Sequence, residues 1–89
     1  MLEIGQQPLP ERDEIRSAIA SEVRAQAARK SLSHQEVADR AGIARSTFAN
    51  KAAGKSGFSV EELVRVARAI DVPTSVLLAA AIETEAASA

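Results

Sequence analysis

The chain has 89 residues and a net charge of −1, and 46% of its residues are hydrophobic, which suffices for one hydrophobic core and is too little for two independent domains. It contains no cysteine, which excludes disulfides and thiolate metal sites, and no apolar run approaches the roughly 20 residues that span a bilayer. We therefore expect one soluble, cytoplasmic domain. Because alanine is abundant and Phe48 and Phe58 are the only Phe, Tyr or Trp residues, we expect it to be all-α.

Five helices are predicted, and the first covers residues 11–30. Its apolar residues recur every four positions and form one stripe along the helix: Ile15, Ile19, Val23 and Ala27.

The second and fourth helices each begin with a capping box. Ser33 is followed three residues later by Glu36, and Ser59 by Glu62. At this spacing each serine and glutamate can satisfy backbone N–H groups that the helix start leaves unpaired. The second helix is expected to stop at Gly42, since glycine tolerates the left-handed backbone of a sharp C-terminal turn.

The third helix is expected to follow Ile43 and reach Gly54. The segment 71–73 contains a proline and ends the fourth helix, after which Thr74 is expected to cap the fifth. The apolar residues of the fourth helix follow helical spacing: Val60, Leu63, Val64, Ala67 and Ile70.

The folded domain is predicted to span residues 11–83. Residues 1–10 are expected to form an N-terminal extension without the apolar segment of a signal peptide, and residues 84–89 a C-terminal tail that is extended or disordered. The fifth helix carries apolar residues that either cover the core of one subunit or form a two-fold interface between two subunits: Val76, Leu77, Ala80 and Ala81.

Charge is unevenly distributed along the chain. Seven of the eleven basic residues lie within residues 24–55, beside only two acidic residues, Glu36 and Asp39. The flanking segments are acidic. Such asymmetry favours an anionic partner for the middle of the chain, with chance clustering as the alternative.

Residues 34–53 have the spacing of a helix-turn-helix. Ala38 leaves room for the next helix to cross closely, and Gly42 makes the turn. Three apolar residues are expected to fill the angle between the two helices: Val37, Ile43 and Phe48.

Residues 32–48, together with Gly54-Lys55 and the segments 60–63 and 67–73, resemble the phage repressor and Cro-like family, also called XRE-like. The resemblance covers roughly residues 15–82. It implies a five-helix domain whose third helix enters the major groove of operator DNA, generally as a homodimer on paired half-sites.

The chain departs from this family's pattern at three places. His34 stands where the family usually has glutamine, and Lys51 where it has an apolar residue, so that Lys51 either folds back along the surface or points toward DNA. Ala27 and Ala52 stand where many members of the family have an arginine and a glutamate that pair. Both charged residues are absent together, which avoids the cost of a single buried charge.

Residues 45–53 are expected to read the DNA. At 100° per residue the inward positions are Phe48, Ala52 and Ala44, and the outward positions are Ser46, Ala49, Asn50 and Ala53. Arg45 begins the helix. Arginine can bond guanine and asparagine can bond adenine in bidentate fashion, so the expected base-reading residues are Arg45, Ser46, Ala49 and Asn50.

Polar residues around this face are expected to hold phosphates, with the positive N-terminal end of the second helix contributing. These phosphate-binding candidates are Ser33, His34, Gln35, Thr47, Lys51 and Lys55.

Catalysis and metal binding find no support in the sequence. His34 is the only histidine, and the four glycines are scattered, so no phosphate-cradling loop is present. We expect no cofactor, no small-molecule ligand and no membrane partner. The function indicated is a sequence-specific DNA-binding transcriptional regulator, a phage or prophage repressor or Cro-like protein. An antitoxin that binds a partner protein and autoregulates is the alternative, and a helical module without a nucleic-acid partner is a third hypothesis.

Overall fold

The computed structural model describes residues 10–88 and places the side chains of residues 13–83. Five α-helices and no strands make up this part of the chain, which confirms the predicted all-α class. In chain order they are α1 (Pro10–Arg29), α2 (His34–Ala41), α3 (Arg45–Ala52), α4 (Val60–Ile70) and α5 (Thr74–Ser88).

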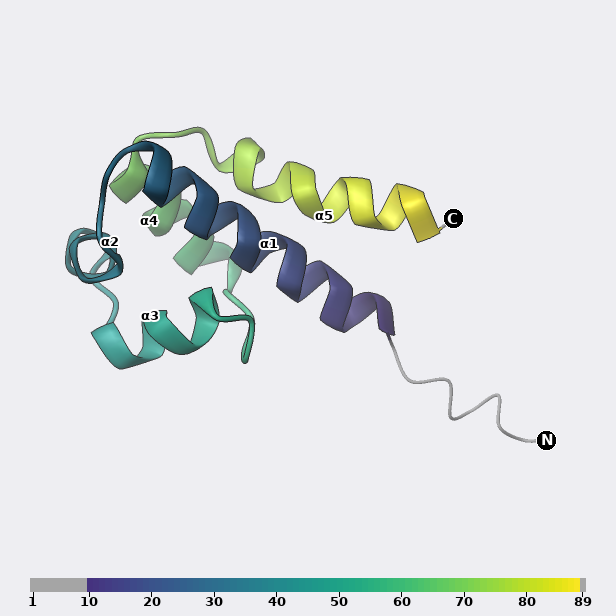
Figure 1. Cartoon of the computed structure of the whole chain (residues 1–89), viewed down its shortest axis with the longest axis horizontal. Helices are drawn as coiled ribbons and strands as arrows, with labels where there is room; N and C mark the ends of the chain where they lie inside the picture. The colour runs from purple at the N-terminus through teal and green to yellow at the C-terminus, as the bar shows by residue number, and fades with distance from the viewer. Residues whose placement is uncertain (1–9, 89) are drawn as a thin grey trace.

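The long helices α1 and α5 run antiparallel, side by side, and the three shorter helices gather at one end of this pair (Figure 1). The start of α1 and the end of α5 extend beyond the shorter helices. Among the described residues, no helix combines the length and hydropathy that crossing a bilayer requires.

Both predicted capping boxes are present. The Ser33 hydroxyl accepts from the backbone N–H of Glu36 at 3.1 Å, and the Glu36 carboxylate accepts from the backbone N–H of Ser33 at 2.8 Å. Ser59 and Glu62 repeat this arrangement with the same distances at the start of α4. Gly42 then ends α2 in the predicted left-handed conformation, at φ +72°.

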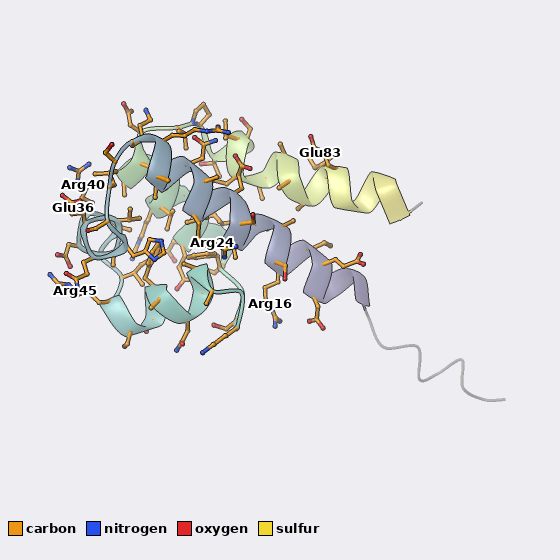
Figure 2. The ribbon with its side chains drawn as sticks, viewed as in Figure 1. Arg16, Arg24, Glu36, Arg40, Arg45 and Glu83 are labelled. Atoms are coloured by element: carbon orange, nitrogen blue, oxygen red, sulfur yellow. The ribbon has the colours of Figure 1, made fainter. Side chains whose placement is uncertain are left out.

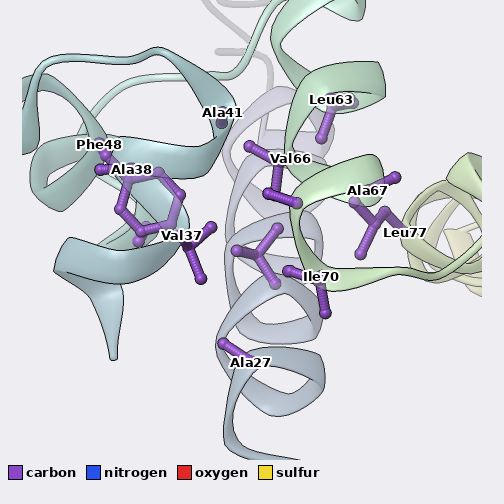
Figure 3. Packing of buried hydrophobic residues seen from close by; sticks show 13 residues of the cluster. Ala27, Val37, Ala38, Ala41, Phe48, Leu63, Val66, Ala67, Ile70 and Leu77 are labelled. Atoms are coloured by element: carbon purple, nitrogen blue, oxygen red, sulfur yellow. The ribbon is translucent and has the colours of Figure 1, made fainter. Parts of the chain in front are cut away.

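One core joins all five helices (Figure 3). Its largest fully buried side chains come from every element: Val23, Val37, Phe48, Val66, Ile70 and Leu77. The small residues Ala27, Ala38 and Ala52 are also buried and let the helices approach closely.

Three expectations about helix ends and faces were wrong. Val60, the first residue of α4, is 77% exposed, although it shares the helical spacing of the buried Leu63 and Ala67. Thr74 is the first residue of α5 and not its cap. The tail after Glu83 is helical as far as Ser88, since alanine and glutamate favour helix and nothing in that segment breaks it. The predicted extension before Pro10 lies outside the described residues.

Candidate nucleic-acid interface

Helices α2 and α3 form the predicted helix-turn-helix. Residues 42–44 connect them, and the Ile43 N–H donates back to the Ala38 carbonyl at 3.0 Å, which closes the turn. Ala38 is fully buried, as its role at the crossing requires, and Ile43 packs against the core. The short, hydrogen-bonded turn fixes how the two helices lie relative to each other.

Phe48 fixes the rotation of α3 about its axis. Its side chain is 0% exposed and lies edge-to-face with the His34 ring, with 5.7 Å between ring centroids. The Phe58 ring approaches from the loop before α4, at 5.9 Å. Ala52, one turn later, is buried as predicted. Ala44 is exposed, contrary to expectation, because it is the N-cap residue and its extended backbone precedes the helical turns.

The opposite side of α3 is open to solvent. The α3 outer face consists of Ser46, Ala49 and Asn50 on this side together with Arg45 at the start of the helix, and all four residues are exposed. Ala53 just after the helix is exposed too. This face offers one guanidinium, one amide, one hydroxyl and one methyl group, which are the kinds of groups that contact base edges.

Arg45 is held by an ion pair that crosses the helix-turn-helix. Its Nε donates to Oδ1 of Asp39 on α2 at 3.1 Å, and its Nη2 donates to Oδ2 at 2.8 Å. Both side chains are more than half exposed, and Arg45 lies at the end of the molecule where α2 and α3 meet (Figure 2). The hydrogen bonds from Arg45 lower the pKa of Asp39, and those to Asp39 raise the pKa of Arg45. Sequence reasoning missed this pair, although an acid and a base flanking the turn were the signal for it.

Lys51 is turned away from the α3 outer face. Its ammonium nitrogen lies 2.6 and 2.7 Å from the two carboxylate oxygens of Glu62, and only 18% of its side chain is exposed. Glu62 also serves the capping box at Ser59, so one carboxylate joins the end of α3 to the start of α4. The hydrogen bond from Lys51 is the main reason that the pKa of Glu62 lies below its ordinary value.

Arg24 connects α1 to the C-terminal end of α3. Its guanidinium donates to the backbone carbonyl of Ala52, between the two helices in Figure 2. Ala27 and Ala52 are both buried where the resembling family has a charged pair. In this chain Arg24, about one turn before Ala27, makes the connection between α1 and α3 instead. It binds a carbonyl at the C-terminal end of α3, where the helix dipole favours a cation.

The remaining phosphate candidates surround the start of α2 and the end of α3. Ser33, His34, Gln35 and Lys55 are exposed, and Thr47 is half-buried. The backbone N–H groups that open α2 have no partner within the helix, and that of Glu36 is already bound by the Ser33 hydroxyl. Several basic residues of the middle segment have internal partners, as Arg40 does at the Ala69 carbonyl, so the basic excess is only partly available to an anion.

The family model of the bacteriophage CI repressor helix-turn-helix domain matches residues 23–81. Two crystal structures of the clp gene regulator ClgR from Corynebacterium glutamicum have a similar fold. One has a TM-score of 0.72 at 21% identity, covering 79% of this chain and 91% of that one. The other has a TM-score of 0.73 at 22% identity, covering 83% and 79%. A search of curated proteins gave no significant match.

Proposed function

Because the chain belongs to the bacteriophage CI repressor helix-turn-helix family, we propose that it is a sequence-specific transcriptional regulator, a phage or prophage repressor or Cro-like protein, that acts on operator DNA in the cytoplasm. One observation carries the proposal. The buried Phe48 fixes the rotation of α3, so that the α3 outer face points away from the core as a polar, solvent-exposed surface. A helix presented in this way fits the major groove of B-DNA.

In this proposal the α3 outer face reads base edges. Arg45, at the start of α3, bonds a guanine, and Asn50 bonds an adenine. Ser46 bonds a base edge, and Ala49 contacts a thymine methyl group. All four residues are exposed, and they lie on a helix of only eight residues.

Phosphates are held beside this face. The start of α2 contributes its positive end, together with Ser33, His34 and Gln35. Thr47 and Lys55 contribute from the α3 side. Lys51 was expected to bind phosphate as well. We now propose that it positions α3, because its ammonium group is already bound by both oxygens of Glu62.

We propose a homodimer through α5. Leu77 is fully buried and covers the core, so it is not available to a second subunit. Leu78 and Ile82, one turn apart on the same helix, are 38% and 63% exposed. A two-fold axis at these side chains would present two copies of α3 to half-sites about 34–36 Å apart.

The test of base reading begins with a duplex selected from a randomised pool by the wild-type chain. Arg45→Ala should weaken this duplex by roughly 5- to 150-fold and abolish discrimination at one base pair. Titration against every single-base substitution of the duplex measures this effect.

Lys55→Ala is the matched control for a phosphate contact. It should weaken selected and random duplexes equally and reduce the slope of log affinity against log salt concentration by about 0.9. If Arg45→Ala also weakens every duplex by one common factor, Arg45 holds a phosphate and does not read a base.

A further inference from the structure

The ion pair between Asp39 and Arg45 has no evident task in holding the domain together. The crossing of α2 and α3 is already set by buried Val37, Ala38 and Phe48. The Asp39 and Arg45 side chains are 55% and 58% exposed, and ion pairs in such surroundings add little to stability. Yet the contact is bidentate, with one hydrogen bond to each carboxylate oxygen. A geometry of this kind restricts the direction of a guanidinium.

The pair uses only one edge of the guanidinium. Arginine has five N–H groups in a planar fork. Nε and one hydrogen of Nη2 bind Asp39, which leaves the second hydrogen of Nη2 and both hydrogens of Nη1. The outer edge, formed by Nη1 and Nη2, therefore keeps two parallel donors. Two parallel donors are what O6 and N7 of a guanine accept.

We propose that Asp39 is a positioning residue for operator recognition, which holds the outer edge of Arg45 ready for a guanine and thereby sets discrimination at that base pair. This inference rests on the proposed function, because it requires Arg45 to read a base. A long side chain that is already held in place loses less conformational freedom on binding than a free one. Asp39 therefore acts through Arg45 and does not itself touch the base.

The test measures the ratio of affinities for the selected duplex and for the same duplex with the guanine replaced, in wild type, Asp39→Ala, Arg45→Ala and the double variant. Asp39→Ala should lower this ratio by roughly 2- to 13-fold, the cost of ordering one long side chain on binding. In the Arg45→Ala background the same substitution should leave the ratio unchanged.

Removal of a carboxylate also raises the affinity of the chain for every duplex, because it removes a negative charge. A control variant measures this effect. Glu61→Ala removes a carboxylate that pairs with an arginine at the same 2.8 Å distance, in an exposed pair on α4. It should change affinity for both duplexes alike and leave their ratio at the wild-type value. Circular dichroism of each variant checks that the helices are retained.

The outcomes separate this inference from the function on which it rests. If Asp39→Ala raises the ratio, the carboxylate competes with the guanine and the inference is overturned. An unchanged ratio overturns it as well, while Arg45 remains a base reader. A pool that yields no preferred duplex, or an Arg45→Ala variant with the wild-type ratio, refutes the proposed base reading itself.

Discussion

Phe48→Ala should destabilise the domain more than any other single truncation on α3. The ring is 0% exposed and contacts the rings of His34 and Phe58. Truncation of a buried phenylalanine to alanine removes the burial of the ring and leaves a cavity, which together cost about 3–5 kcal/mol. We expect a loss of this size in the free energy of unfolding.

Thermal and urea unfolding followed by circular dichroism measure this loss. For a domain of this size, 3–5 kcal/mol lowers the melting temperature by roughly 12–40 °C. Phe58→Ala is the matched control, because that ring is only half-buried and its removal should cost about 1–2 kcal/mol. If the two variants melt together, Phe48 does not anchor α3 and the orientation derived for its outer face is wrong.

Three further predictions concern contacts between helices. Folding lowers the pKa of Glu62, so the folded chain binds fewer protons at this carboxylate than the unfolded chain does. The stability that Glu62 and Lys51 contribute is therefore present above the ordinary glutamate pKa of 4.5 and is lost as the pH falls below it. Unfolding of wild type and Glu62→Gln across this range should show a gap that closes in acid, and a gap independent of pH would contradict the pairing. Arg24→Ala should cost about 1–2 kcal/mol in urea unfolding by removing the bond to the end of α3, whereas Arg29→Ala on the exposed side of α1 should be near neutral. Ile82→Asp should shift sedimentation toward the monomer at micromolar concentration, and a wild-type chain that stays monomeric alone and on DNA would refute the proposed dimer.

Local patterns in the sequence predicted the starts of α2 and α4 and the turn after α2 well. The capping boxes at Ser33 and Ser59 depend on residues three positions apart, and Gly42 acts within a single turn. The inward position of Phe48 was predicted from the angle of 100° per residue around α3. The structure confirms it, because α3 is a regular helix at this point. The same rotation failed at Ala44, because the angle of 100° per residue applies only after the helix has begun.

Contacts between helices were not predictable in this way. The pairing of Lys51 with Glu62 depends on how α3 approaches α4, and sequence reasoning left Lys51 with two alternatives. The pair between Asp39 and Arg45 depends on the crossing of α2 and α3, which is set by buried side chains elsewhere. A count of basic residues therefore overstates the charge available to DNA, because several of these residues are engaged within the fold.

The contacts of α3 separate its structural duties from its reading surface. Lys51 and the Ala52 carbonyl are bound at the end of the helix, and Phe48 is buried in its middle. Exposed positions without such duties accept substitution at little cost in stability. Exchanges at Ser46, Ala49 and Asn50 can therefore give the same scaffold new operators, which makes this short helix a suitable starting point for engineering repressors with altered DNA targets.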